Sequence, residues 1–334
     1  SLWNVMSHAI SKNHLGRGLE MLEPQNKFYH LLKNDLKTKL DSLPLVLTDS
    51  VSSAKLRQRI RHLCINMEQW RWEQMDFNRP YVLVNIPSFQ LDVIDNDSLV
   101  FESNVVVGTP VSQTPTLDSK LVNMILYPYW NVPRDIATKE LLPKIKSDST
   151  YLLSNRYRVL DIQGREIHPD SIDWKAHHVN NFPFMIQQSE GEHNALGIVK
   201  FNFINDFNIY LHDTNAKRFF GYDKRAYSHG CIRVERALDL ARFLVSRENP
   251  YASVNDYQRF LKAGKQQQVN IDPIELRIRY FTCHAGKDGV VRFFDDIYQK
   301  NASLMEALFC RENIDTCPDV NQTTALKSLV VAKL

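Results

Sequence analysis

Two helical patterns occupy the first part of the chain. Before residue 80, apolar side chains recur at a spacing of three and four residues, which places them on one face of a helix. The first set is Phe28, Leu31, Leu32, Leu36 and Leu40, and the second is Leu56, Ile60, Leu63, Cys64 and Met67. We therefore predict a helical region over residues 1–78, with a loop at DSLPLVLTDS between the two helices.

The pattern changes to that of β-strands at Tyr81. The segments YVLVNIPSFQLDVID and SLVFESNVVVG are rich in Val, Ile, Leu and Phe, and the turn-prone residues 95–97 separate them, so they predict a β-hairpin. Further strands are predicted at NMILYPYWNVP, GIVKFNFIN and FNIYLHD. In the last of these, alternation puts Tyr210 and His212 on one face and Leu211 on the other.

A helix and a final hairpin are predicted after these strands. Apolar residues at helical spacing predict the helix over 237–245, and IELRIRYFTCH with GVVRFFDDIY predicts the hairpin. Residues 133–190 differ from their surroundings, because they are polar and show little strand alternation around one short helical segment, TKELLPKI. They predict an insertion within a β domain rather than a separate core. The chain is thus predicted to be α+β overall, with a mainly β domain over 79–300 and a tail over 301–334.

Composition narrows the possible functions only a little. The chain has 334 residues, of which 43% are hydrophobic and 24% charged, as in an ordinary globular protein. Its net charge is +3 and its Lys and Arg residues are scattered, so no nucleic-acid partner is indicated. The chain begins at Ser1, and we expect a preceding segment to be missing, which leaves export and a membrane or lipid anchor open.

The cysteines exclude some kinds of site. There are five of them, so at least one thiol is unpaired, and no CxxC pair points to a zinc ribbon or a thioredoxin-like motif. Cys310 and Cys317 are close enough in the sequence to pair in an oxidising compartment. The sequence leaves that pairing open.

One cysteine stands beside a histidine in YSHGCIRV, and a second histidine lies upstream in YLHDT. A cysteine is a strong nucleophile as a thiolate, and a nearby imidazole lowers its pKa by pairing with it. On residue types alone, the reading of Cys231 as a small buried hydrophobe comes ahead of the nucleophile reading. A zinc site with Asp213 as fourth ligand is disfavoured, because structural zinc normally uses two spaced ligand pairs.

The wider pattern resembles the signature of L,D-transpeptidases of the YkuD type. That signature is a His, a spacer of about fifteen residues, Ser/Thr-His-Gly-Cys, a hydrophobic residue, and Asn or Arg, and it matches the chain from His212 to Arg233. Five other segments look like the large, YcbB-like branch of this family, over roughly residues 55–300. They are NMEQWRW, VVVGTPVSQTP, YPYWNVPRDIATKELLPKI, NALGIVKFNFIN and YFTCHAGKDGVVRFFDDIY.

The resemblance implies a fold and a catalytic set. The fold is a β-sandwich-like catalytic domain in which residues 133–190 match an inserted capping subdomain. Cys231 matches the nucleophile and His212 its base, with the backbone carbonyl of Asp213 orienting the imidazole. The backbone N–H groups of Gly230 and Cys231 would face the oxyanion.

Four more residues are carried over as substrate-binding positions. His229 matches the second histidine of the signature, a supporting residue, and Arg233 matches a position that often shapes the substrate site. Trp130 and Tyr210 are expected to line the cleft, although for Tyr210 a role as a packed aromatic side chain is an equal alternative. Members of this branch often carry a small peptidoglycan-binding domain, and none is found in residues 1–78, where the loop between the helices is too short for one.

The function implied by the resemblance is the formation of 3→3 cross-links in peptidoglycan. A tetrapeptide stem is the donor, the side-chain amine of another stem's diamino acid is the acceptor, and D-Ala is released from a Cys231 thioester. No metal or organic cofactor is expected, carbapenems are expected to acylate the enzyme, and the site of action would be the periplasm or cell envelope. The same acyl-enzyme also serves an L,D-carboxypeptidase, a D-amino-acid exchange enzyme or a protein-attachment enzyme, and a non-catalytic peptidoglycan-binding protein stays open.

Overall fold

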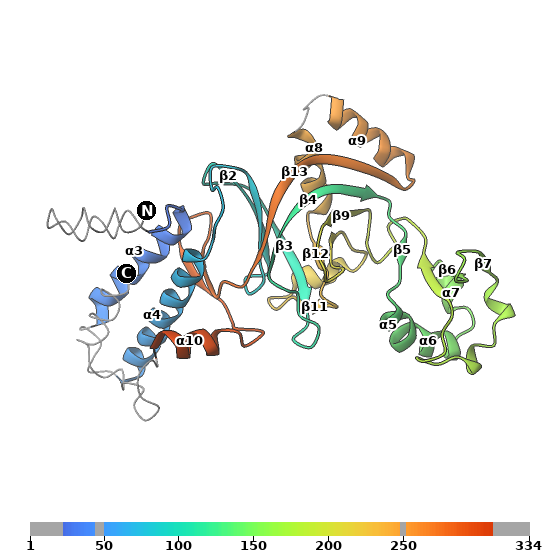
Figure 1. Cartoon of the computed structure of the whole chain (residues 1–334), viewed down its shortest axis with the longest axis horizontal. Coiled ribbons are helices and arrows are strands. Elements are labelled where there is room, and N and C mark those ends of the chain that lie inside the picture. Colours follow the sequence, from blue (N-terminus) through green and yellow to red (C-terminus); the bar gives the residue numbers. More distant parts are fainter. Residues whose placement is uncertain (1–22, 44–49, 248–251, 310–334) are drawn as a thin grey trace.

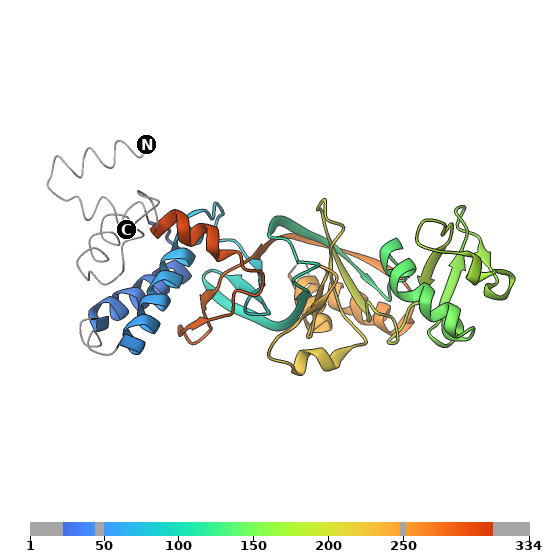
Figure 2. The same ribbon diagram turned by 90° about the horizontal axis from the view of Figure 1, so that it is seen from below.

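The computed structural model describes residues 23–43, 50–247 and 252–309 of the chain. Three parts follow one another along its long axis (Figures 1 and 2): helices near the N-terminus, a large sheet in the middle, and the 133–190 insertion at the far end. Cys310 and Cys317 lie outside the described residues, so their pairing stays a prediction. None of the helices in the described ranges combines the length and the apolar character needed to cross a bilayer.

The central sheet is mixed and closes on itself. Within the described residues its strand order is β11-β3-β12-β10-β9-β4-β13-β1-β2, and β2 pairs in turn with β3. The strands are β1 (Tyr81–Asn85), β2 (Gln90–Asp95), β3 (Ser98–Gly108), β4 (Leu117–Leu126), β9 (Val199–Phe203), β10 (Leu211–His212), β11 (Ala226–Ser228), β12 (Ile232–Val234) and β13 (Gln267–Arg279). Closure removes most unpaired edges from the sheet.

The predicted hairpin is present as β2 and β3, which pair antiparallel from Gln90↔Asn104 to Asp95↔Ser98. Asn96 and Asp97 at its turn both have positive φ, as tight hairpin turns require. The segment before it was predicted as one strand and is two. A turn at residues 86–89 separates β1 from β2, because Pro87 cannot donate to a ladder and the N–H of Phe89 turns back to the carbonyl of Ile86.

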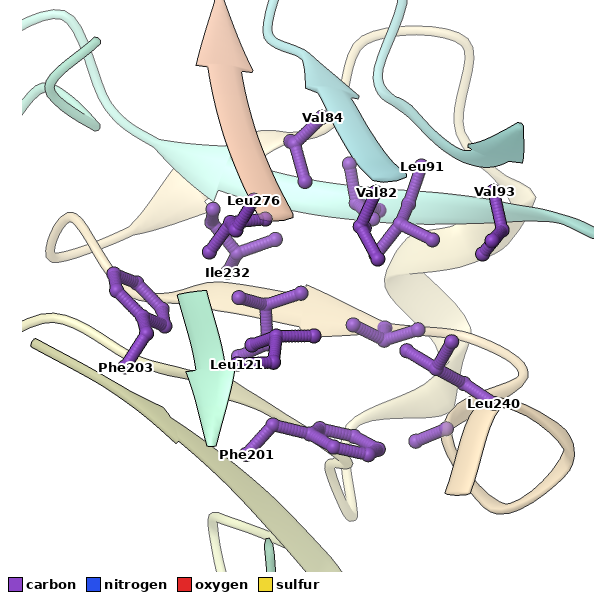
Figure 3. Close-up of a cluster of buried hydrophobic side chains, with 14 of the residues drawn as sticks. Val82, Val84, Leu91, Val93, Leu121, Phe201, Phe203, Ile232, Leu240 and Leu276 are labelled. Carbon is purple, nitrogen blue, oxygen red and sulfur yellow. The ribbon is translucent and has the colours of Figure 1, made fainter. Parts of the chain in front are cut away.

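Inward-facing side chains of these strands fill the closed sheet, and Figure 3 shows part of this cluster. Helix α8 (Ala237–Ser246) matches the predicted helix and buries its apolar stripe against the same core. Helix α9 (Ala252–Ala263) was not predicted, and Tyr257 on it donates a hydrogen bond to the carbonyl of Leu238. Both helices therefore cover the sheet on one side (Figure 1).

The predicted final hairpin is only partly right. Residues 267–279 form the long strand β13 between β4 and β1, with Ile274, Leu276 and Ile278 buried in the core. Only β14 (Cys283–Ala285) and β15 (Val291–Phe293) pair as a hairpin. The long strand forms because two neighbouring strands are available to it, which is a tertiary effect that local alternation does not reveal.

The two N-terminal helices agree with their apolar patterns. They are α3 (Lys27–Ser42) and α4 (Ser50–Arg71), and their inner faces pack with the β14–β15 hairpin around a second cluster. The predicted face residues buried there are Phe28, Leu32, Leu36, Ile60, Leu63 and Met67. Helix α10 (Asn301–Phe309) lies beside α4 (Figure 1), in what was predicted as a tail.

The insertion has more structure than its composition suggested. Within the described residues it forms, together with the preceding residues 130–132, a separate sheet of order β5-β8-β6-β7 and a cluster of buried side chains, so the prediction of an insertion without a core is wrong. This cluster was not visible in the sequence, because Val132, Leu141, Phe182 and Ile186 are spread too widely along the chain to show as a pattern. Its strands are β5 (Trp130–Asn131), β6 (Tyr157–Leu160), β7 (Glu166–Ile167) and β8 (Met185–Gln188). Its helices are α5 (Arg134–Ile136), a π-helix (Ala137–Leu141), α6 (Leu142–Ser147), α7 (Tyr151–Ser154) and two 3₁₀ turns (Pro169–Ser171 and Trp174–Ala176).

Candidate functional site

The two short strands β10 and β12 place the candidate residues on one face. They pair parallel in the register Leu211↔Ile232 and His212↔Arg233, and the N–H of Ile232 bonds the carbonyl of Tyr210 at 3.1 Å. Leu211 and Ile232 point into the core and are fully buried. Successive residues of a strand face opposite ways, so His212 and Arg233 lie on the face turned away from the core. Tyr210 and Cys231, two residues earlier in each segment, lie on that same face.

His212 is a buried, neutral imidazole with one nitrogen committed. Its Nδ1 is hydrogen-bonded to the backbone carbonyl of Asp213, and since a carbonyl only accepts, the ring donates there and keeps Nε2 as its acceptor. Burial lowers the pKa of His212 to about 3, and the charges of Arg233, Lys200 and Lys217 act in the same direction. The predicted contact with the Asp213 carbonyl is present, and its catalytic role stays a prediction.

The Cys231 thiol is half-buried and protonated at rest. Burial raises its pKa, opposed by hydrogen bonding from Tyr210 and by the charges of Lys200 and Arg233. Among the described residues, the thiol is hydrogen-bonded to Tyr210. The structure therefore does not favour the expected pairing with an imidazole that would lower the pKa of Cys231. The physical reason is that His212 is itself too buried to carry a charge.

Tyr210 and Trp130 extend this face. Burial raises the pKa of the Tyr210 phenol, which also bonds Cys231 and accepts from the Trp130 indole. The Tyr210 ring meets the His212 ring edge-on at 5.5 Å, and the Lys200 ammonium lies 4.1 Å from its centroid. The structure therefore brings Tyr210 to the thiol and Trp130 to Tyr210.

A hydrogen-bonded turn holds Cys231 in place. Gly230 has φ +107°, and its N–H donates to the Ser228 hydroxyl at 3.1 Å, while that hydroxyl donates to the carbonyl of Cys231 at 2.5 Å. Thr114 donates to the carbonyl of Gly230 at 2.8 Å and accepts from the N–H of Gly108 at 2.9 Å. The Gly230 N–H thus already has an acceptor, and is not the free oxyanion donor that the prediction assumed.

Sequence reasoning missed the residues that support this turn. Ser228 and Thr114 are both buried, and the Tyr298 hydroxyl donates to the carbonyl of Gly108 at 2.6 Å. Ser228 belongs to the SHGC motif and Thr114 to the VVVGTPVSQTP segment, so both lay in stretches that had been singled out. Tyr298 gave no signal, because its partner is far away in the sequence.

The carboxylate of Asp213 faces away from the imidazole. One oxygen accepts from the N–H of Ile198 at 2.9 Å and the other contacts Lys217. A Cβ on Gly197, which has φ +59°, would lie 2.3 Å from the carboxylate, so only glycine fits there. Asp213 therefore meets His212 through its backbone alone.

The remaining predicted residues lie around this face. Nε2 of His229 is 2.7 Å from Oε1 of Glu140 on the π-helix of the insertion, so its side chain reaches the insertion. The Arg233 guanidinium lies 5.5 Å from the centre of the Phe219 ring, on the 3₁₀ helix Lys217–Gly221. In the part of the chain that the structure describes, no group of three or more His, Cys, Asp or Glu side chains is placed to hold a metal ion.

Comparison with known proteins gives one family match. The family model for the L,D-transpeptidase catalytic domain, YkuD, matches residues 79–266, which include every candidate residue above. A curated protein of Haemophilus influenzae, named as a proposed L,D-transpeptidase, is 36% identical over 237 residues. That match spans 71% of this chain and 45% of the relative, so this chain covers about half of the relative's length.

Solved L,D-transpeptidases are also matched, at low similarity. One from Mycobacterium smegmatis is 8% identical with a TM-score of 0.28, covering 60% of this chain and 58% of that one. L,D-transpeptidase 3 from Mycobacterium tuberculosis is 11% identical with a TM-score of 0.28, covering 60% of each chain. Scores this low carry no structural argument.

Proposed function

The chain belongs to the L,D-transpeptidase family with a YkuD catalytic domain, and from this premise we propose that it forms 3→3 cross-links in peptidoglycan through a thioester on Cys231. The family is one of acyltransferases. The observation that carries the finer proposal is the pairing of β10 with β12, which puts His212 and Cys231 on the same outer face of adjacent strands. We assign residues 79–300 to the catalytic unit and residues 133–190 to a cap on it.

In the acylation step, Cys231 Sγ attacks the carbonyl carbon between the diamino acid and the terminal D-Ala of a tetrapeptide stem. The thiol proton passes to Nε2 of His212, which the carbonyl of Asp213 orients through Nδ1. His212 then protonates the leaving nitrogen, the C–N bond breaks, and D-Ala departs. A thioester on Cys231 remains, with the backbone N–H of Cys231 as the proposed oxyanion donor.

In the transfer step, the side-chain amine of a second stem attacks the thioester carbonyl. Nε2 of His212 takes a proton from the attacking amine, the C–S bond breaks, and the proton returns to the sulfur of Cys231. The product is an amide between two third-position residues. No step needs a cofactor.

The resting charges decide how the proton moves. The pKa of Cys231 is raised by burial and that of His212 is lowered to about 3, so the resting pair is a thiol beside a neutral imidazole. Proton transfer is therefore expected to accompany the attack instead of preceding it. Since higher pH favours loss of the thiol proton, we expect acylation to accelerate as pH rises above neutral.

The insertion is proposed to cover the reacting groups. Trp130, just before the insertion, bonds Tyr210, and Glu140 on the insertion's π-helix pairs with His229, which is close to Cys231 in the sequence. Contacts on both sides of the thiol would exclude water and so favour transfer to an amine over hydrolysis. This activity is proposed to take place in the bacterial cell envelope, where peptidoglycan lies.

The test is incubation with a purified disaccharide-tetrapeptide, followed by mass spectrometry. A dimer that has lost one D-Ala supports the proposal, whereas a tripeptide alone would make the protein an L,D-carboxypeptidase. Added D-amino acid or a lysine-bearing acceptor protein would reveal exchange or attachment. Cys231→Ala is the control and should give no product and no adduct with a carbapenem. Cross-linking by Cys231→Ala would show that the nucleophile is wrong, and substrate binding without any product would indicate a peptidoglycan-binding protein.

A further inference from the structure

A pocket of about 450 Å³ lies between strands β2 and β3 of the central sheet and the β14–β15 hairpin. None of its lining residues belongs to the Cys231 face described above. The lining residues are Gln90, Asp92, Leu99, Glu102, His284, Gly286, Lys287, Asp288, Arg292 and Phe294. Figure 1 shows that β2 lies at the end of the sheet nearer the N-terminal helices, opposite the insertion.

A buried histidine at this pocket has no hydrogen-bond partner among the described residues, and a buried carboxylate lies near it. The side chain of His284 is 3% exposed and both of its ring nitrogens are unpaired. The side chain of Asp92 is 10% exposed, and its Oδ2 is 3.8 Å from Nε2 of His284, too far for a hydrogen bond. Buried polar groups are nearly always paired, so this pair of residues is suited to a ligand that bridges them.

The His284 ring is held by stacking instead of hydrogen bonds. Its centroid lies 4.5 Å from that of Phe28, and 6.2 Å from those of Trp70 and Phe281, to whose planes it is nearly parallel. These rings belong to the second apolar cluster. The imidazole is therefore fixed before any ligand arrives, which lowers the entropic cost of binding.

The charged side chains around the pocket are of both signs. Burial, and after it the negative charge of Glu102, raises the pKa of Asp92 to about 7. Lys287 has no ion-pair partner among the described residues, and Arg292 is paired with Asp288 at 2.6 Å. Above pH 7 the buried Asp92 is thus anionic, and the exposed Lys287 lies among the other lining residues.

We propose that this pocket binds a small apolar amino acid or a short peptide by its free amino end. The ammonium group would donate a hydrogen bond to Asp92, close to Glu102. Another of its N–H groups would reach the unprotonated nitrogen of His284. The carboxylate would face Lys287, and Leu99 and Phe294 would contact the side chain. An anion is disfavoured by the two carboxylates, and a metal ion by the lack of a third ligand group in the described chain.

The proposal is independent of the transpeptidase reaction and is tested by titration of the full chain carrying Cys231→Ala, which removes acyl chemistry. The probes are L-leucine, its 2-hydroxy-acid analogue, and 3-methylbutylammonium, which is leucine without the carboxylate. Calorimetry at pH 8 and amide shifts of residues 284–294 measure binding. L-leucine should bind, the amine should bind more weakly, and the hydroxy acid should bind at least about tenfold more weakly than leucine.

Variants locate the site and control for charge. Asp92→Asn should weaken leucine binding at least about tenfold, and His284→Phe, which keeps the stacking, should weaken it as well. Asp95→Asn removes one negative charge from the same hairpin outside the pocket and should leave the affinity unchanged. Lowering the pH from 8 to 6 protonates Asp92 and should weaken binding in the protein with Asp92 but not in Asp92→Asn. Equal binding of the hydroxy acid, an unchanged affinity in Asp92→Asn, or no binding of any amine at millimolar concentration would overturn the proposal.

Discussion

Among the described residues two histidines are buried, and burial lowers the pKa of both, but their hydrogen bonding differs. His212 lies on the Cys231 face, has its Nδ1 bonded to the Asp213 carbonyl and is surrounded by the charges of Arg233, Lys200 and Lys217. His284 lies at the far pocket, where both ring nitrogens are unpaired. Burial alone therefore does not define the role of a histidine, because the partner of its second nitrogen fixes what the first can do.

The two regions also differ in how their other polar groups are hydrogen-bonded. Around Cys231, the Ser228 hydroxyl satisfies a donor and an acceptor of the turn at once. At the pocket, the Asp92 carboxylate is buried beside a histidine that does not bond it. Removing a polar group should thus destabilise the first region and stabilise the second, and the predictions below test this contrast from the largest expected effect to the smallest.

The largest effect is expected from His212→Asn, measured as the rate of acylation by a carbapenem with mass-spectrometric detection. Without Nε2 as proton acceptor, the rate should fall by about 10³-fold or more. His168→Asn is the matched control, because His168 is an exposed histidine of the insertion and its rate should stay at the level of the unaltered protein. A loss of similar size in His284→Phe would remove the distinction between the two buried histidines.

Asp92→Asn should raise the free energy of unfolding at pH 8 by up to about 4 kcal/mol, which is the equivalent of the rise in the pKa of Asp92 from 3.8 to about 7. In the folded protein the pKa of Asp92 is raised to about 7, so between pH 4 and 7 the folded state holds a proton that the unfolded state has lost. Stability therefore declines as pH rises through this window, and the penalty is complete above it. Denaturant unfolding at pH 5 and pH 8 should show the gain chiefly at pH 8.

His284 should change the free energy of unfolding with pH in the opposite direction to Asp92, which sharpens this test. Its pKa is lowered to about 4, so on acidification below about pH 6.5 the unfolded state binds a proton that the folded state refuses. Stability is lost as pH falls through that range, and His284→Phe should remove the loss. If Asp92→Asn is destabilising at pH 8 instead, the carboxylate has a partner that the structure does not show.

Sequence patterns predicted the Cys231 face well, because its residues belong to a short motif and to one alternating strand. The SHGC motif marks the turn, and the alternation in FNIYLHD put Tyr210 and His212 on one face, where their rings meet. The helix over 237–245 and the apolar faces of the N-terminal helices were also predicted, because each is a stripe within one element.

The pocket could not be predicted from the sequence, because no local pattern connects its parts. Asp92 lies on β2 and becomes buried only when the β14–β15 hairpin covers it, and that hairpin was itself predicted with wrong limits. The core of the insertion was missed for the same reason. Ser228 was visible in the motif, but its two hydrogen bonds depend on the path of the turn, for which Gly230 adopts a positive φ.

Ser228→Ala tests the region around Cys231, where the polar groups of the turn are hydrogen-bonded. The substitution leaves the N–H of Gly230 and the carbonyl of Cys231 without their partner, and should lower the free energy of unfolding by about 1–3 kcal/mol. Ser228→Thr keeps the hydroxyl and should recover most of that loss in the same denaturant titration. Stability unchanged in Ser228→Ala would mean that the turn does not depend on this hydroxyl.

The smallest effect is expected at His229, the other histidine of the motif. Its contact with Glu140 joins two side chains that are 54% and 44% exposed, and exposed ion pairs contribute about 0.2–1 kcal/mol. A double-mutant cycle of His229→Ala and Glu140→Gln should give a coupling energy within that range, decreasing with added salt. Acylation of His229→Ala should decrease by less than about tenfold, since the ring contacts the insertion and its loss corresponds to about 1 kcal/mol. If His229→Ala abolishes acylation while His212→Asn leaves it intact, the base is the histidine beside the cysteine, and the ranking of the two must be reversed.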